Sequence, residues 1–155
     1  MSQDAVLAEL RSQIGREESP GEWMMVDQER IDRFADATED HQWIHVDAGR
    51  ARKESPYGDT IAHGFLTLSL LPALTGAVAE GRSPYPGVKL GVNYGLNRVR
   101  FPAPVKSGSR VRSKGKLLEV TEVSGGLQLV KEITIEVQGE EKPCCVAETI
   151  SRLYF

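Results

Sequence analysis

The segment from residue 61 to residue 80 is apolar on nearly every side, and it constrains the fold more than any other part of the chain. A helix that is hydrophobic all round must be buried on all sides. Pro72 falls inside the segment, and proline removes a backbone donor and crowds the preceding turn, so we expect a kink or an early end there. The large apolar residues of the segment are Ile61, Phe65, Leu66, Leu68, Leu70, Leu71, Leu74 and Val78.

The chain after residue 87 is predicted to form strands: one or two over 88–101, and one each over 109–120, 127–138 and 142–154. The period of a β-strand is clear in 109–120 and 127–138. Hairpin turns are predicted at 124–126 and 139–141. In 127–138 the alternation directs five apolar side chains inward: Leu127, Leu129, Ile133, Ile135 and Val137. In the last strand, small side chains on one face would let a helix lie close: Cys145, Ala147, Thr149 and Ser151. This pattern predicts an α+β fold in which an antiparallel sheet wraps around a long central helix.

Helices are also predicted nearer the start of the chain, over 4–14, 28–37 and 48–53. Asp27 and Asp47 stand where they can cap the second and third of these helices. The 155 residues suit a single domain, with residues 1–20 forming an N-terminal helix and lead-in.

Composition excludes several classes of protein. The net charge of −3 and an aromatic content of 6% do not favour nucleic-acid binding. No apolar run is long enough for a membrane span, and residues 1–9 do not have the pattern of a signal peptide. The only cysteines, Cys144 and Cys145, are adjacent in a strand and point to opposite faces, so we expect no disulfide between them. We therefore expect a reducing, cytoplasmic setting.

The candidate catalytic side chains lie in the segment Asp40-His41-Gln42-Trp43-Ile44-His45. We place this segment in a loop after the helix over 28–37. About twenty residues later, Ala62-His63-Gly64 opens the apolar segment. A carboxylate and an imidazole can hold one water between them and move its proton. A glycine N–H at a helix start can stabilise negative charge on a carbonyl oxygen.

These residues resemble the MaoC-like hydratases of the hot-dog fold. In that family an aromatic residue precedes an Asp-x-Asn-Pro-aliphatic-His motif, and here Phe34, Asp40, Ile44 and His45 match it. Gln42 stands where the family usually has Asn, and Trp43 where it usually has Pro. These departures are similar to the nodulation-protein-N-like branch. The resemblance covers roughly residues 20–155 and includes three further segments: 34–38, 62–65 and 99–105.

The resemblance implies a cofactor-free enzyme that reversibly hydrates trans-2-enoyl-CoA thioesters to (R)-3-hydroxyacyl-CoA. Asp40 and His45 would activate the water, and the Gly64 N–H would hold the thioester oxygen. A homodimer is expected, with an acyl-CoA or acyl-carrier-protein thioester as substrate. The residues assigned to substrate binding are Gln42, His63, Arg98 and Arg100.

Alternative interpretations stay open at this point. The residue pattern by itself favours a structural role for His63, such as a bond to a loop backbone, and close packing at a helix start is the alternative for Gly64. Residues 97–118 hold seven basic residues and no acidic one, which fits either a phosphate-binding surface or a solvated strand face. A zinc site on His41 and His45 is not expected, because Gln42 stands where a zincin has Glu.

Two other activities fit the same fold. A thioesterase would direct the water to the carbonyl carbon, and a non-catalytic module would bind acyl thioesters without turnover. Fold alone does not separate these, and the Asp-to-His spacing favours hydration.

Overall fold

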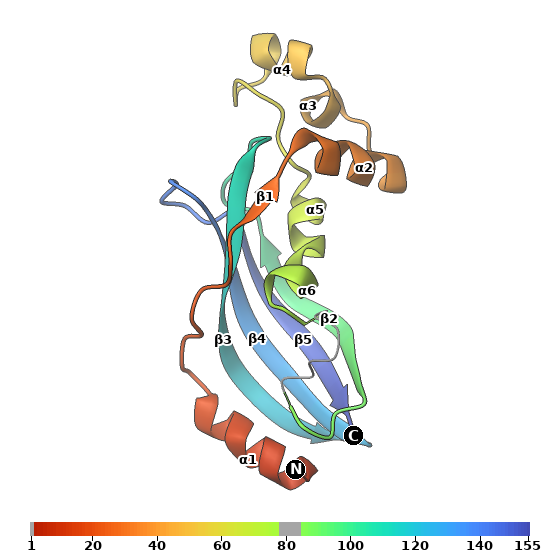
Figure 1. Ribbon diagram of the computed structural model, residues 1–155, viewed down its shortest axis with the longest axis vertical. Helices are drawn as coiled ribbons and strands as arrows, with labels where there is room; N and C mark the ends of the chain where they lie inside the picture. Colours follow the sequence, from red (N-terminus) through yellow and green to blue (C-terminus); the bar gives the residue numbers. More distant parts are fainter. Residues whose placement is uncertain (1, 78–84) are drawn as a thin grey trace.

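A five-stranded antiparallel sheet forms the body of the protein in a computed structural model that describes residues 2–77 and 85–155. The strand order is β1-β3-β4-β5-β2, and the long strands curl around two short helices, α5 and α6 (Figure 1). This arrangement confirms the predicted α+β layout. The strands are β1 (Met24–Val26), β2 (Leu90–Arg100), β3 (Ser109–Val123), β4 (Gly126–Val137) and β5 (Cys145–Tyr154).

The alternation predicted for 109–120 and 127–138 is confirmed in β3 and β4. In β4 the five side chains expected to point inward are all at most 5% exposed. Strand β3 pairs with β4 from Val111 opposite Val137 to Val123 opposite Gly126, through a tight turn at Ser124 and Gly125. Cys144 and Cys145 are both free and buried. The centre of the sheet is thus set by period-2 hydrophobicity, as the sequence indicated.

The central helix is interrupted near Pro72, as predicted, and it begins at Gly64 and not at residue 61. The chain forms α5 (Gly64–Ser69) and α6 (Leu71–Leu74), and Pro72 lies in the first turn of α6. Proline is tolerated there because the first N–H groups of a helix need no intrahelical acceptor. Residues before Gly64 are extended, with Ile61 bridged to Lys106. Residues 78–80 of the predicted helix, like 81–84 of the loop expected after it, lie outside the described residues.

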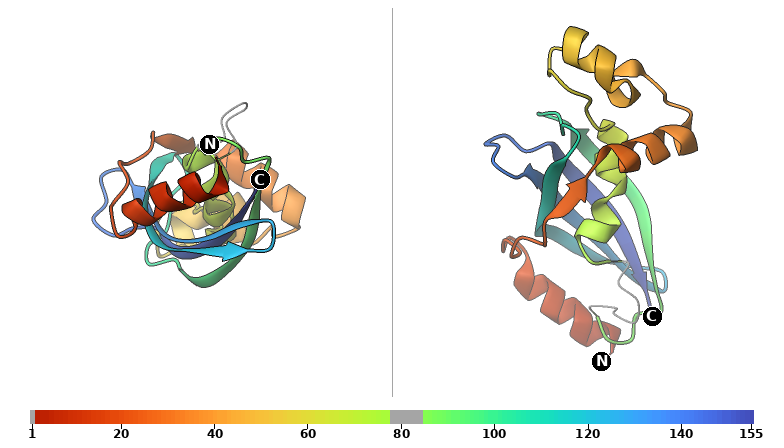
Figure 2. Two further views of the ribbon diagram at one scale, coloured as in Figure 1. Left: turned by 90° about the horizontal axis from the view of Figure 1, so that it is seen from below. Right: turned by 45° about the horizontal axis from the view of Figure 1, so that its top comes forward.

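The expectation that this segment is buried on every side also needs correction. Phe65 is 69% exposed, whereas Leu66, Leu70, Leu71 and Leu74 are buried. The sheet curls around one side of α5 and α6 and leaves the other side uncovered (Figure 2).

The helices nearer the start of the chain form as predicted. Asp27 accepts a hydrogen bond from the Arg30 N–H, and Asp47 accepts one from the Arg50 N–H, so both capping predictions are confirmed. The motif is not entirely a loop, because a one-turn helix begins at Trp43. The elements are α1 (Gln3–Gln13), α2 (Gln28–Thr38), α3 (Trp43–Val46) and α4 (Ala48–Glu54).

Two apolar clusters fill the interior, and they lie toward opposite ends of the long molecule. The central core joins α2, α5 and α6 to the sheet and includes Ile31, Leu66, Leu74, Ile133 and Ile135. The second cluster, which we call the α1 core, consists of Val6, Leu7, Leu10, Leu117, Val120, Leu127 and Leu129.

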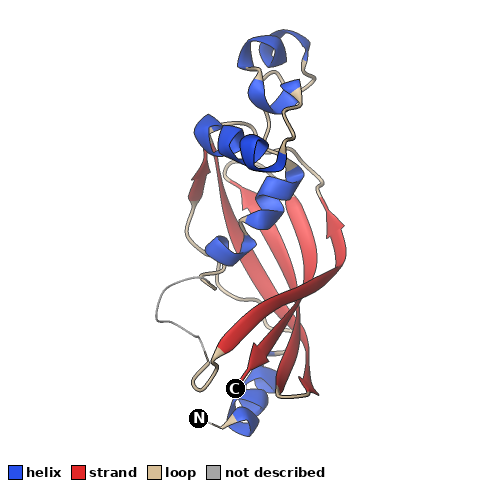
Figure 3. Ribbon diagram, turned by 90° about the vertical axis from the view of Figure 1, so that its right-hand side faces the viewer, coloured by secondary structure: helices blue, strands red, loops and turns tan. Residues whose placement is uncertain are grey.

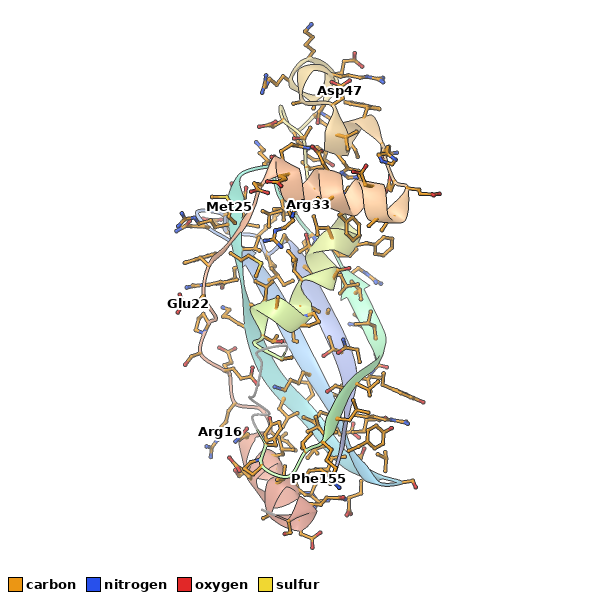
Figure 4. All side chains as sticks on the ribbon, turned by 45° about the vertical axis from the view of Figure 1, so that its right-hand side comes forward. Arg16, Glu22, Met25, Arg33, Asp47 and Phe155 are labelled. Carbon is orange, nitrogen blue, oxygen red and sulfur yellow. The ribbon has the colours of Figure 1, made fainter. Side chains whose placement is uncertain are left out.

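Figure 3 shows α2, α3 and α4 at one end of the sheet and α1 at the other. Asp47 and Phe155 mark these two ends in Figure 4. None of the helices in the described part of the chain is long and apolar enough to cross a membrane.

Candidate active site

The end of α2 places Asp40 at the start of the motif. Helix α2 stops at Glu39, which adopts the left-handed conformation with φ 63°. A non-glycine residue in this region is uncommon and carries strain. The turn releases the chain from the helix, so Asp40 is exposed while its Oδ1 accepts a hydrogen bond from the Gln42 N–H at 3.3 Å. The Asp40 carboxylate is therefore oriented by a backbone N–H of its own loop and remains accessible to a ligand.

His45 lies in α3 and is only 7% exposed. Its Nδ1 is 2.7 Å from the carbonyl oxygen of Ile61. A carbonyl can only accept, so Nδ1 carries the proton and the Nε2 lone pair is left available as a base. Burial lowers the pKa of His45 below its ordinary value, although the bond to Ile61 opposes this effect. His45 is therefore a neutral imidazole near neutral pH.

His63 contacts both of these residues, although it is 23 positions from Asp40 in the sequence. Its ring stacks on the His45 ring with centroids 3.8 Å apart, and its Nε2 donates to the Asp40 carbonyl oxygen at 2.9 Å. The Phe34 ring packs against it at 4.9 Å. His63 Nδ1 is buried without a hydrogen-bond partner among the residues that the structure describes. The structure thus adds a third member to the predicted Asp–His pair.

Asp40, His45 and His63 each offer an atom within 4.8 Å of the others. One water that makes two hydrogen bonds of about 2.8 Å can span such a separation. A metal ion is the other occupant to consider, since two imidazoles and a carboxylate are common ligands. An imidazole lone pair lies in the plane of its ring. Because the His45 and His63 rings are stacked, their lone pairs lie in two separate planes and do not converge on one point. The arrangement suits proton transfer better than metal coordination.

The His41 and His45 pair does not come together as a ligand set. His41 is exposed and its Nε2 lies 2.9 Å from Asp36 Oδ1. This hydrogen bond raises the pKa of His41 above its ordinary value. The residue that joins Asp40 and His45 as a third potential metal ligand is His63. The sequence had suggested His63 for substrate binding and not as a ligand.

Gly64 begins α5, so its N–H has no acceptor within the helix. A Cβ at this position would meet the Phe101 ring at 2.9 Å. Close packing is therefore a real requirement for glycine here, in addition to any role of its N–H. Phe101 also lies edge-on to the exposed Phe65, with centroids 6.2 Å apart. The surface beside the helix start is lined by two aromatic rings.

The two residues that depart from the family motif have separate positions. Gln42 is exposed, and its backbone N–H is what reaches Asp40. The Arg50 guanidinium lies 4.3 Å above the Trp43 ring, so Trp43 links α3 to α4.

The basic stretch divides into two parts. Arg112 and Lys114 both pair with Glu136, each at 2.8 Å, which lowers the pKa of Glu136. These two cations share one carboxylate, which offsets part of the positive charge of this strand face. Arg98 and Arg100 are exposed near the end of β2, just before Phe101 and therefore near Gly64. Sequence alone did not separate these two groups.

Sequence reasoning missed Gln28 and Thr60. The Gln28 side chain bonds to the His45 carbonyl and to the Thr60 hydroxyl. Gln28 and Thr60 are 32 positions apart, and no motif joins them.

Comparison with known proteins agrees with the fold. An antiparallel sheet curled around a short helix defines a hot-dog protein. The pattern of the MaoC like domain matches residues 9–139. The chain therefore belongs to the MaoC-like family.

Two relatives have nearly half of their aligned residues in common with this chain. The 3-hydroxyacyl-thioester dehydratase Z of Mycobacterium tuberculosis is 49% identical over 147 residues, which are 94% of each chain. Nodulation protein N of Rhizobium leguminosarum bv. viciae is 49% identical over 151 residues, 96% of this chain and 91% of that protein. In both, the similarity extends over almost the full length of the protein.

A solved structure also has this fold. The monoamine oxidase regulatory protein from Archaeoglobus fulgius superposes with a TM-score of 0.76 over 92% of this chain and 90% of that one, at 23% identity.

Proposed function

We propose that this protein reversibly hydrates trans-2-enoyl thioesters to (R)-3-hydroxyacyl thioesters. The observation that carries the proposal is the convergence of Asp40, His45 and His63 within 4.8 Å, with His45 Nε2 left free as a base. The dehydratase among the relatives is named for the reverse direction of the same reaction. No cofactor is required, because both directions are proton transfers coupled to the making or breaking of one C–O bond.

The reaction follows from the positions of these groups. Asp40 and His45 hold one water, and His45 Nε2 accepts a proton from it while the oxygen bonds to Cβ of the enoyl group. The electron pair of the double bond moves to Cα and onto the thioester oxygen. The Gly64 N–H stabilises that oxygen. The proton then passes from the Asp40–His45 pair to Cα, which completes the addition of water.

His63 has a supporting role in this scheme. Its bond to the Asp40 carbonyl and its stack on His45 hold the acid and the base in one geometry. Its ring also excludes water from one face of His45, which is consistent with the lowered pKa of His45.

We assign binding of the phosphate-bearing part of the substrate to Arg98 and Arg100. Gln42 is placed at the rim of the site. A guanidinium suits the phosphates of coenzyme A or of a carrier-protein phosphopantetheine. Both arginines are exposed, and the residue after Arg100 packs on Gly64. A substrate held there by its phosphate would have its thioester directed toward the helix start.

We also propose that the protein is a homodimer. Strand β2 is an edge strand, and its exposed side chains include Leu90 at 55%, Tyr94 at 56% and Leu96 at 46%. A long apolar edge favours pairing with a second copy. The cytoplasm remains the expected compartment, because Cys144 and Cys145 are both free thiols.

Incubation with crotonyl-CoA tests the activity. We expect the absorbance of the conjugated enoyl thioester to fall and chiral chromatography to detect the (R)-3-hydroxy product. Release of free thiol would identify a thioesterase instead. Binding with neither change would identify a non-catalytic acyl-thioester module.

A further inference from the structure

We propose that Gln28 and Thr60 are positioning residues that hold His45 in its working orientation. This inference rests on the proposed function for its consequence, but the contacts that carry it are independent of any substrate. Gln28 is the first residue of α2, and Thr60 lies in the extended segment before α5. Neither residue belongs to the motif around Asp40 and His45.

Both N–H groups of the Gln28 amide and one of the two lone pairs of its oxygen are used. Its Nε2 donates to the His45 carbonyl oxygen at 2.7 Å and to Asp32 Oδ1 at 2.8 Å. Its Oε1 accepts from the Thr60 hydroxyl at 2.5 Å. A carbonyl and a carboxylate can only accept, so the amide nitrogen must face them and the amide cannot be flipped. Thr60 itself is 0% exposed, and a buried hydroxyl needs such a partner.

These bonds close a circuit around His45. The His45 ring donates to the Ile61 carbonyl, and the Ile61 N–H in turn donates to the Ile44 carbonyl at 3.0 Å. The His45 backbone carbonyl is bound through Gln28 to Thr60, the neighbour of Ile61. Both the ring and the backbone of His45 are therefore tied to the same two-residue segment.

The shortness of α3 explains why the backbone needs this support. The last carbonyls of a helix have no intrahelical partner, and a four-residue helix consists almost entirely of ends. Gln28 supplies a donor to one of these carbonyls. The segment that holds Thr60 is anchored in turn, because the Thr60 carbonyl accepts from the Ser107 N–H at 3.0 Å.

The chemical consequence concerns which ring nitrogen carries the proton. The Ile61 carbonyl stabilises the Nδ1–H tautomer, which leaves Nε2 as the base. If the circuit opens, α3 can move relative to residue 61 and the ring loses the contact that selects this tautomer. A misplacement of about 1 Å can cost a catalytic step up to about 100-fold.

Two isosteric variants test the circuit. Gln28→Glu keeps the shape but places carboxylate oxygens against the His45 carbonyl and Asp32. Thr60→Val replaces the hydroxyl with a methyl group of similar size, so the hydrogen bond to Gln28 is lost. We expect each to lower kcat for crotonyl-CoA hydration by about 10–100-fold with little change in KM, because neither residue touches substrate.

Two further variants serve as controls. Thr60→Ser restores the hydroxyl and should return kcat to near the wild-type value. Gln13→Glu changes another helical glutamine that donates to a carboxylate one turn away, in α1 and far from the site, and should leave kcat unchanged.

The ¹⁵N NMR spectrum of the His45 ring gives the deciding measurement. The wild-type protein should show the Nδ1–H tautomer alone, and the folded Gln28→Glu and Thr60→Val variants should show a mixture. If Gln28→Glu does not fold, Thr60→Val carries the test. A single tautomer and wild-type kcat in a folded variant would overturn the inference. If the wild-type protein hydrates no enoyl thioester, the proposed function fails, and the tautomer measurement still decides the positioning role.

Discussion

The central core and the α1 core differ in what they bury. The described buried polar residues lie beside the central core, namely His45, Thr60, His63, Thr67 and Ser113. The buried side chains of the α1 core are all aliphatic, and the partly buried Tyr85, Leu153 and Phe155 pack against them. Aliphatic contacts are non-directional, whereas a buried polar group is stable only with particular partners at particular distances. We infer that one end of the molecule is organised for chemistry and the other for stability.

The strongest test of this contrast is the Asp40 and His45 pair. Asp40→Asn and His45→Gln should each lower kcat for enoyl-CoA hydration by about 10²–10⁴, the usual contribution of a general acid or base. The double mutant should be little worse than either single mutant, because the two residues act on one water. His45 is buried in α3 and not in a loop, so a thermal melt must accompany the assay. A folded single mutant with near wild-type kcat would exclude the assignment.

Substitution in the α1 core should have the opposite result. Leu10→Ala removes a side chain that is 0% exposed, and we expect the free energy of unfolding to fall by about 2–5 kcal/mol. The kcat of the folded protein should be unchanged, because the α1 core is at the other end of the sheet. Urea unfolding and a crotonyl-CoA assay at low temperature measure the two quantities. A large loss of kcat in the folded variant would mean that the two ends are coupled.

Gly64 separates packing from catalysis within the central region. A Cβ there meets Phe101 before anything else, so Gly64→Ala should displace that ring and Gly64→Val should displace it further. Phe101 is 41% exposed and can turn outward, so the cost in stability should be small. If the N–H also holds the thioester oxygen, Gly64→Val should lose about 10²–10³-fold in kcat, the usual effect of losing an oxyanion donor.

The Phe101→Ala background resolves the two roles of Gly64. Removing the ring removes the clash, and a packing role then predicts recovery of activity in Gly64→Val. An oxyanion role predicts that the defect persists, because the valine side chain still shields the N–H.

Arg98 and Arg100 should have a smaller effect. Replacing either with Glu should raise KM for CoA substrates a few-fold and change kcat less, because phosphates bind equally in the ground and transition states. The effect should shrink at high salt, since both side chains are exposed. Lys116→Glu, on the outer strand face, is the matched control. An unchanged KM in both arginine variants would assign the phosphate site to other residues.

The pH dependence is the mildest test. Burial lowers the pKa of His45, so its base form persists below pH 6.5. The acid limb of the kcat/KM profile should therefore lie at pH values below 6.5. Because of the same shift, His45 binds a proton more readily in the unfolded chain than in the folded protein. The neutral, buried His45 therefore contributes fully to the free energy of unfolding above pH 6.5, and this contribution is lost as the pH falls through the pKa of His45 in the folded protein. His45→Gln should remove this part of the pH dependence of stability. An acid limb above pH 6.5 would contradict the buried, neutral imidazole.

Much of this protein follows from local sequence. The alternation in 127–138 predicted which side chains of β4 are buried, and Asp27 and Asp47 predicted where two helices begin. These features depend on residues within one or two turns of each other, so their physics is contained in short segments. The order of Asp40, His45 and Gly64 also indicated the family, which comparison confirmed.

Contacts between distant segments were decided by the tertiary structure. Glu136 pairs with both Arg112 and Lys114 because β3 and β4 pair in one register, and no pattern in 109–120 could reveal that.

The interior of the site depends on folding in the same way. Pro72 predicted the interruption of the central helix, but the stack of His63 on His45 depends on where the start of that helix lies relative to α3. The bond from Gln28 to Thr60 crosses 32 positions, and the contact of Phe101 with Gly64 joins a strand end to a helix start. Local propensity selects the elements of a chain, but packing and register select which of their side chains meet.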